Sequence, residues 1–247
     1  NWAVSGSWTV PTNALSGVYY AKFERLDVSG QNNFALFVVR SNSAADILVQ
    51  TSDATWHAYN MYGGASLYFG DADAPFNSQR ATKVSYNRPL SRSTEQESTF
   101  FGPEFPLVRW LERNGYSVNY CTQLDTQRDA QMIRRHKVFI SSGHDEYWTK
   151  EQRANVTAAR DAGVNLVFFS ANEIFWKTRL EPAVAGGATA NRTLVCYKET
   201  LDGAKTDPTS EWTGTWRDAR FSPPADGGAP ENRSEERRVG KECSLTC

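Results

Sequence analysis

The residues best suited to chemistry in this chain lie in the segment Gly143-His144-Asp145-Glu146-Tyr147-Trp148. His144 and Glu146 stand two positions apart, just after a predicted strand, where a tight turn can aim an imidazole and a carboxylate at one point. Such a pair can move protons in catalysis, and with further donors it can hold a metal ion. The alternative is structural: Asp145 and Glu146 would cap the helix predicted to start at Thr149, because acidic side chains offset the helix dipole. These residues alone leave both interpretations open.

Several other chemistries are disfavoured by the sequence around the candidate nucleophiles and ligands. Cys121 is followed by Thr-Gln-Leu, which lacks the small residues of a nucleophile elbow, and no Gly-x-Ser-x-Gly elbow occurs. No glycine-rich nucleotide loop occurs either. The chain has only three histidines, so a zinc site with several His or Cys ligands is disfavoured. An iron site made by His57, His144 and Glu146 is an alternative that the spacing permits but does not require.

The composition places the chain among globular proteins. Of its 247 residues 40% are hydrophobic and 22% are charged, which excludes disorder, collagen and coiled coil. No apolar run approaches the roughly 20 residues that a membrane helix needs. The formal net charge of −1 comes without an evident basic face, so we expect neither a nucleic acid nor a membrane as partner.

The elements that must position these residues follow a strand–helix alternation. Short apolar strands are predicted at 46–50, 116–121, 137–142 and 164–170, with helices at 104–114 and 149–162. Continuous apolar strands between helices indicate a parallel sheet covered on both faces, and ligands bind outside the carboxyl ends of such strands. We therefore predict a Rossmann-like, glutamine-amidotransferase-like three-layer α/β domain over residues 43–232. Further expectations are an aromatic, glycine-rich turn at 56–70, a long loop at 71–99 with one short strand at 84–86, and a last strand at 193–198.

The first part of the chain, residues 1–42, is predicted to be the C-terminal part of a β-rich module. Residues 7–10, 18–26 and 34–39 are expected to form strands. Alternation along 18–26 places Tyr19 on the inward face and Tyr20 on the other.

The last residues, 233–247, resemble the in-frame translation of a sequencing adapter, so we treat them as a non-native tail and exclude them from fold reasoning. The remaining chain keeps Cys121 and Cys196, too few for a disulfide scaffold, and whether they pair stays open. Because residue 1 is Asn and not Met, we expect a fragment or a processed chain that continued past residue 232. The compartment cannot be inferred.

Five motifs together resemble the C-terminal catalytic domain of the large (beta) subunit of N,N-dimethylformamidase. They are Trp56-His-Ala-Tyr59-Asn60, Gly63-Gly64-x-Ser-Leu-Tyr68, Phe101-Gly-Pro-Glu104, Ser142-Gly-His144-Asp-Glu146-Tyr147-Trp148 and Asn172-Glu-x-Phe-Trp176. The similarity covers roughly residues 15–200, in matching order and spacing.

This resemblance implies an iron-dependent hydrolase that cleaves the C–N bond of a small amide. It implies one Fe(III) ion held by two tyrosines and a glutamate, which are Tyr19, Tyr59 and Glu146 here, with Tyr20 as the near alternative to Tyr19. It implies His144 as the catalytic acid and base. A small subunit and a homo-oligomer are implied as partners.

The implied chemistry is coherent, because phenolate and carboxylate are hard donors suited to Fe(III), which polarises a carbonyl and acidifies water. An aromatic wall from Trp56, Tyr62 and Trp148 would suit a small, weakly polar amide. The alternative function is a non-catalytic binding or structural module of a larger protein, such as a secreted one. The two functions are distinguished by four residues, Tyr19, Tyr59, His144 and Glu146. A non-catalytic module has no need for four such side chains to converge, so their presence favours the enzyme.

Overall fold

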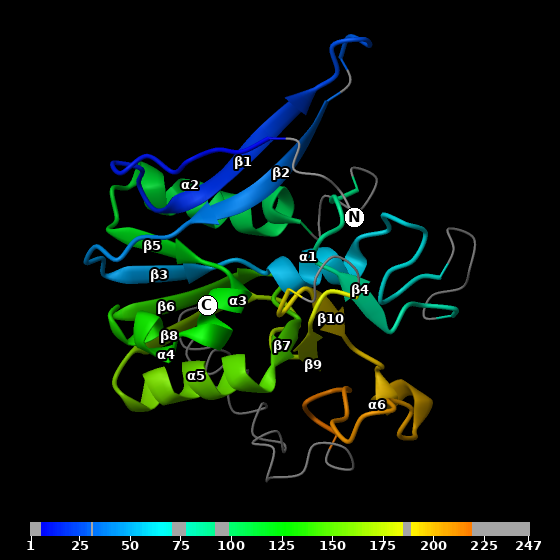
Figure 1. Ribbon diagram of the computed structural model, residues 1–247. Coiled ribbons are helices and arrows are strands. Elements are labelled where there is room, and N and C mark those ends of the chain that lie inside the picture. The colour runs from blue at the N-terminus through cyan, green and yellow to red at the C-terminus, as the bar shows by residue number, and fades with distance from the viewer. Residues whose placement is uncertain (1–5, 31, 71–77, 92–98, 185–188, 219–247) are drawn as a thin grey trace, which may run out of the picture.

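The computed structural model describes residues 6–30, 32–70, 78–91, 99–184 and 189–218. Within these ranges the chain forms a mixed α/β fold with two four-stranded sheets and a separate β-hairpin (Figure 1). No helix in this part of the chain has both the length and the apolar character needed to cross a membrane. The predicted tail at 233–247 and parts of the predicted loop at 71–99 lie outside the described residues.

The central sheet is entirely parallel, as the sequence predicted. Its order is β5 (Val118–Cys121), β3 (Ile47–Gln50), β6 (Val138–Gly143) and β8 (Asn165–Ser170). The neighbouring pairs β3–β5, β3–β6 and β6–β8 all run in the same direction. Each strand lies within about two residues of its predicted range, because a buried strand needs a continuous apolar run that is visible in the sequence.

Helices and the hairpin cover the two faces of this sheet. Leu48 and Phe139 point to one face, where they pack with residues of α4 (Ala130–Arg134) and α5 (Lys150–Asp161). Val49 and Ile140, one position further along each strand, pack on the other face with α2 (Phe105–Arg113) and residues of the hairpin. Helix α3 (Gln123–Arg128) precedes α4. The sheet therefore lies between α4 and α5 on one face and α2 with the hairpin on the other, which is a three-layer arrangement. The prediction of a sheet covered on both faces is confirmed.

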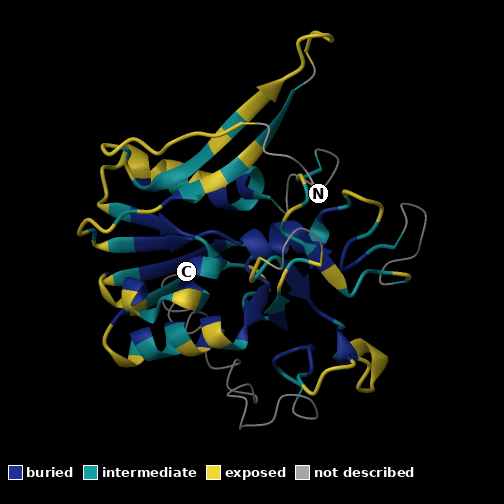
Figure 2. Ribbon diagram, viewed as in Figure 1, coloured by how far each residue is buried: buried dark blue, intermediate teal, exposed yellow. Residues whose placement is uncertain are grey.

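The hairpin consists of β1 (Gly17–Glu24) and β2 (Asn32–Val39), paired antiparallel. Val18 and Val38 pack against the central sheet. The outer part of the hairpin is exposed, including Tyr20 at 59% and Phe23 at 60% (Figure 2). The predicted strand at 7–10 is wrong, since these residues pair with no strand in the described part of the chain.

A second sheet, which the sequence did not predict, lies beyond the carboxyl edge of the first (Figure 1). Its order is β4 (Lys83–Ser85), β10 (Thr193–Val195), β9 (Trp176–Glu181) and β7 (Tyr147–Thr149). The predicted strands at 84–86 and 193–198 are confirmed as β4 and β10, although the second is shorter than expected. Strands β7 and β9, and the sheet that the four strands form, were not predicted. The short helix α6 (Glu199–Asp202) and a π-helical turn, η2 (Phe100–Glu104), complete the fold.

Helix α1 (Asp53–Tyr59) lies next to both sheets and was also not predicted. Its residues Asp53 to Ala58 are all buried (Figure 2), so it has no solvent-exposed face and therefore no amphipathic period to detect. The buried Glu104 carboxylate holds its first turn, accepting from the Ser52 backbone N–H at 3.1 Å and the Trp56 indole N–H at 2.6 Å.

The two cysteines outside the tail do not pair. Cys121 and Cys196 are both free and fully buried. Burial raises the pKa of the Cys121 thiol well above its usual value and that of Cys196 to about 11. A buried thiol that stays protonated is a poor nucleophile, so neither residue is a candidate for catalysis.

Candidate active site

Four side chains converge on the carboxylate of Glu146. Tyr68 Oη donates to Oε1 at 2.5 Å, and Tyr59 Oη donates to Oε2 at 3.2 Å. Trp176 Nε1 donates to Oε1 at 3.0 Å. His144 Nε2 lies 3.4 Å from Oε2. We call Tyr59, Tyr68, His144, Glu146 and Trp176 the Glu146 cluster.

The cluster is built at the carboxyl edge of the central sheet. Tyr59 is the last residue of α1, which follows β3, and His144 and Glu146 lie in the turn between β6 and β7. Strands β3 and β6 are parallel neighbours, so their carboxyl ends share one edge. The chain passes from β3 outward to β5 and then back to β6, and the point where the strand order reverses is where ligands bind in such sheets. The expected meeting of Tyr59, His144 and Glu146 is observed.

The backbone of Glu146 is held from two sides. Its N–H donates to Thr55 Oγ1 at 3.1 Å, and its carbonyl accepts from the N–H groups of Phe175 and Trp176 at 3.1 and 2.9 Å. Thr55 and Tyr59 are four positions apart on α1 and therefore share a helix face. One face of α1 thus fixes both the backbone and the carboxylate of Glu146.

Glycine is required at the start of the turn that carries His144. Gly143 has φ = +84°, and a Cβ there would lie 2.6 Å from Cγ of Glu104. The Glu104 carboxylate also accepts hydrogen bonds from Ser52 and Trp56 at the start of α1. The turn that carries His144 and the helix that carries Tyr59 therefore both pack against Glu104.

The cluster has a buried interior and a more open side. The Glu146 side chain is 5% exposed and that of His144 is 19% exposed. Tyr68 is buried, whereas Tyr59 is half-buried. Tyr59 and His144, whose ring centroids lie 5.5 Å apart, are therefore the more exposed members of the cluster.

Burial and the neighbouring carboxylate set the protonation of Tyr68. Burial, and next the negative charge of Glu146, raise the pKa of the Tyr68 phenol far above its usual value. The Lys198 ammonium lies on the other side, 3.1 Å from the centroid of the Tyr68 ring and 4.8 Å from that of Trp176. Burial lowers the pKa of Lys198 to about 7. Its Nζ has no hydrogen-bond partner in the described part of the chain, so its contacts here are with aromatic faces.

The structure does not bring Tyr19 to the cluster. Its hydroxyl donates to the Leu15 carbonyl at 3.0 Å, and its ring stacks on Phe37 at 5.9 Å, both within the N-terminal region of the described chain. Tyr20 packs against Phe34 and Phe101 instead. Alternation along one strand predicts a face but cannot predict which other element that face meets.

Tyr68 is the residue that sequence reasoning missed. It stood at the end of the motif Gly63-Gly64-x-Ser-Leu-Tyr68, but its role was not foreseen. The Ser66 hydroxyl accepts from the backbone N–H groups of Tyr68 and Phe69, at 3.1 and 3.0 Å, and so folds the chain back toward α1. This side-chain-to-backbone turn is the local signal that could have drawn attention to Tyr68.

The predicted aromatic wall of Trp56, Tyr62 and Trp148 is not at the cluster. Trp148 is fully buried in the core beneath the central sheet, and its indole N–H donates to the Asp145 carbonyl. Trp56 donates to Glu104, and Tyr62 is 40% exposed.

The donors present limit which metals the cluster suits. The described residues contain no group of three or more His, Cys, Asp or Glu side chains placed to hold a metal ion. His57 packs on Tyr86, with ring centroids 4.3 Å apart, and makes no contact with His144 or Glu146 among the described residues, so the iron site of two histidines and a carboxylate is not supported. Two phenol oxygens and a carboxylate do meet, and this all-oxygen set fits a hard cation.

Asp145 has a structural role that differs from the predicted one. It accepts from Gln50 Nε2 at 2.7 Å, Gln123 Nε2 at 2.7 Å and Ser141 Oγ at 2.6 Å. The N-cap of α5 is Thr149, whose Oγ1 accepts from the Gln152 N–H at 3.2 Å. The interpretation of Asp145 and Glu146 as helix caps is therefore wrong.

Asp145→Asn should lower the free energy of unfolding by about 2–4 kcal/mol, because its amide NH₂ would replace one carboxylate oxygen and face at least one of the three buried donors. Urea unfolding followed by circular dichroism measures this loss. The control is Asp46→Asn, whose exposed ion pair with Lys137 should contribute less than about 1 kcal/mol. Equal losses in the two variants would contradict the buried network.

Comparisons with known proteins identify the family of the chain. A family model described as N,N-dimethylformamidase beta subunit-like, C-terminal, matches residues 1–240. The match extends into the segment 233–247 that was set aside above. The N,N-dimethylformamidase beta subunit of Alcaligenes sp. is 25% identical over 223 residues, which is 73% of this chain and 28% of that relative. The chain therefore spans just over a quarter of the length of the curated relative that it matches.

Proposed function

The chain belongs to the N,N-dimethylformamidase beta subunit-like, C-terminal family, and from this premise we propose that it hydrolyses the C–N bond of a small amide. The observation that carries the proposal is the convergence of Tyr59, Tyr68 and His144 on the Glu146 carboxylate. A protein that only binds or supports a partner has no need for two phenols, an imidazole and a carboxylate at one point.

We further propose that the cluster holds one Fe(III) ion through Tyr59, Tyr68 and Glu146. Tyr68 takes the place that the resemblance gave to Tyr19, because Tyr68 contacts Glu146 and Tyr19 does not. When bound, such an ion would supply the Lewis acidity that polarises the amide carbonyl and makes water acidic at neutral pH. Trp176 Nε1 also donates to Tyr68 Oη at 3.1 Å, and this donor would stabilise negative charge on that oxygen.

His144 is proposed to move the protons. As the partly exposed member of the cluster, it takes a proton from the attacking water and returns it to the departing amine nitrogen. The Glu146 carboxylate, 3.4 Å from Nε2, stabilises the imidazolium between these two steps. Asn172 Nδ2 lies 3.4 Å from the same nitrogen and helps to orient the ring.

The test is to assay the purified chain on N,N-dimethylformamide and related small amides, with metal analysis and a visible absorption spectrum. We expect one iron per chain, a tyrosinate-to-Fe(III) charge-transfer band, and release of amine. Because the relative is a beta subunit, we propose a small subunit and a homo-oligomer as partners, so the assay is run with and without the small subunit. A colourless, iron-free and inactive protein in both assays would instead favour the binding-module alternative.

His144→Gln should lower kcat by about 100- to 10,000-fold while the charge-transfer band remains, because the proton carrier is lost and the oxygen donors are not. Steady-state kinetics and absorption spectra of the same sample measure both effects. His136→Gln is the control, since His136 is bonded to Asn119 and the Met132 carbonyl, outside the cluster. An unchanged kcat in His144→Gln would remove the residue from the mechanism.

A further inference from the structure

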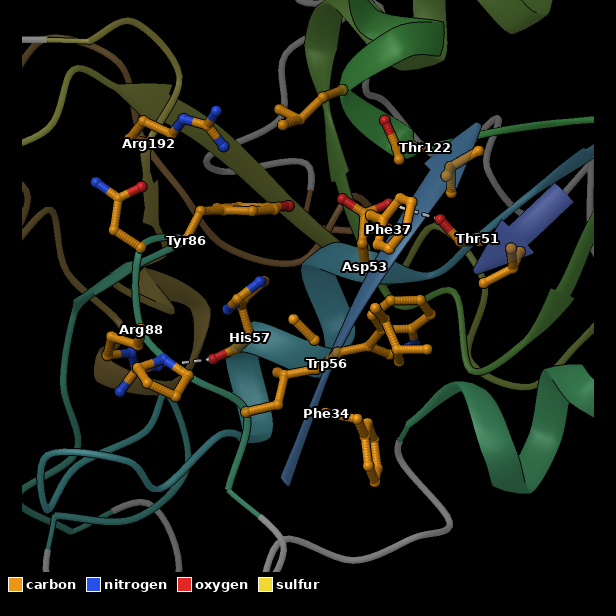
Figure 3. A pocket seen from close by; sticks show the side chains of 18 of the residues that line it. Phe34, Phe37, Thr51, Asp53, Trp56, His57, Tyr86, Arg88, Thr122 and Arg192 are labelled. Atoms are coloured by element: carbon orange, nitrogen blue, oxygen red, sulfur yellow. Dashed lines mark hydrogen bonds between the residues drawn. The ribbon is translucent and has the colours of Figure 1, made fainter. Parts of the chain in front are cut away.

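A pocket lies on the opposite side of α1 from the Glu146 cluster. It has a volume of about 620 Å³ and is bounded by α1, strand β2 and the segment 86–90 (Figure 3). This volume lies within the range of sites for small organic ligands. No member of the Glu146 cluster lines it.

The helix α1 separates the two sites by its own geometry. Thr55 and Tyr59 contact Glu146, whereas Asp53 and His57 line the pocket. Positions two apart on a helix differ by about 200°, so these two pairs point in opposite directions. The pocket is therefore distinct from the candidate active site.

Two arginines line the pocket, and they differ in what they bind. Arg88 donates to backbone carbonyls of His57, Tyr62 and Ala65, at 3.0, 2.8 and 3.0 Å, and so fixes the wall. Arg192 is half-buried and forms no side-chain hydrogen bond or ion pair with the described residues. Figure 3 shows it on the same side of the pocket as Tyr86 and His57. The guanidinium of Arg192 is thus available to a ligand.

The remaining polar groups favour a ligand with a single negative charge. Burial, and next the charges of Arg88 and Arg192, lower the pKa of His57 to about 3, so this imidazole is neutral and adds no positive charge. The Asp53 side chain also lines the pocket, with Oδ1 accepting from Thr51 Oγ1 at 3.0 Å and the Gln123 N–H at 2.8 Å. One available guanidinium beside a carboxyl group suits a monoanion and disfavours a dianion such as phosphate.

The rest of the lining is apolar and aromatic. Phe34 and Phe37 come from β2, Trp56 comes from α1, and Leu36 and Leu90 add aliphatic surface. A flat apolar body fits against such side chains, while a guanidinium pairs with a carboxylate through two parallel hydrogen bonds.

We propose that this pocket binds a small monocarboxylate with a flat apolar body, its carboxylate paired with Arg192 and its body against the aromatic residues of β2 and α1. The proposal does not depend on the hydrolase activity.

The probe is benzoate, titrated calorimetrically into the full chain, with benzamide and benzyl alcohol as uncharged compounds of the same shape. We expect benzoate to bind with a Kd on the order of 0.1–1 mM and the two neutral compounds at least tenfold more weakly. Arg192→Met should weaken benzoate at least tenfold. Arg109→Met, at an exposed arginine on α2 outside the pocket, should not weaken it.

A carboxylate is also a ligand for iron, so the site of binding is checked separately. Glu146→Gln should retain benzoate binding, because Glu146 is not part of the pocket. The proposal is overturned if benzoate does not bind at 10 mM, if benzamide binds equally well, if Arg192→Met binds like the parent chain, or if Glu146→Gln abolishes binding. The Arg192 side chain forms no hydrogen bond or ion pair with the described residues, and its backbone bonds to Glu181 and Tyr86 do not depend on the side chain, so its replacement should leave the circular dichroism spectrum unchanged.

Discussion

Replacing Glu146 with glutamine should abolish amide hydrolysis, with kcat/KM falling by about 1,000-fold or more, and should remove bound iron. Tyr59, Tyr68 and His144 all contact the Glu146 carboxylate, so its charge organises the whole cluster. The neutral amide would be a weak ligand for a hard cation and would leave the His144 imidazolium without its counter-charge. Steady-state kinetics and metal analysis of the purified variant measure both losses.

The matched control is Glu112→Gln. Glu112 also accepts a tyrosine hydroxyl, that of Tyr120 at 2.7 Å, but it lies on α2, outside the cluster. This variant should keep iron and activity. If Glu146→Gln retained both as well, the proposed site would be wrong, and the alternative of a non-catalytic module would become the better account.

Tyr68→Phe should shift and weaken the charge-transfer band, because only the Tyr59 phenolate remains, and should lower kcat/KM by about 100-fold or more, whereas Tyr19→Phe should change neither. The Tyr68 hydroxyl bonds Glu146 and Trp176 in a buried place, while the Tyr19 hydroxyl bonds only the Leu15 carbonyl among the described residues. Absorption spectra and kinetics of the two variants therefore compare the ligand set that the structure favours with the one that the resemblance implied.

The control for loss of a phenol is Tyr120→Phe, which removes a hydroxyl bonded to a glutamate far from iron chemistry. Its spectrum should match that of the parent chain. The opposite pattern, with the band shifted and weakened in Tyr19→Phe and unchanged in Tyr68→Phe, would restore Tyr19 as a ligand. It would also mean that the hairpin approaches Glu146 when metal is bound.

The Glu146 cluster and the pocket lined by Arg192 lie on opposite faces of one short helix, α1, which is buried over most of its length. Thr55 and Tyr59 form hydrogen bonds with Glu146, while Asp53 and His57 line the pocket. The proposals remain separable, because Arg192→Met tests only the pocket and Glu146→Gln tests only the cluster.

The amino-acid sequence by itself determined the central sheet and the place of the turn that carries His144 and Glu146. Apolar runs such as 137–142 can be buried only in a sheet covered on both faces, and the carboxyl end of such a strand is where polar residues gather. The motifs within 56–176 also indicated the family, because their order and spacing are properties of the chain alone.

The tertiary structure alone decided which tyrosine joins Tyr59 at Glu146. Tyr19 and Tyr68 were both available, and strand alternation favoured Tyr19, but alternation only assigns a face and not the neighbour that the face meets. Helix α1 and strand β7 were likewise not predicted, because a helix buried all around has no amphipathic period and three residues are too few to show alternation. Strands β4 and β10 were predicted at 84–86 and 193–198, but only the tertiary structure decided that they form one sheet with β7 and β9. These elements are stabilised by long-range contacts such as those of Glu104 with Ser52 and Trp56, which form only once the central sheet has brought distant segments together.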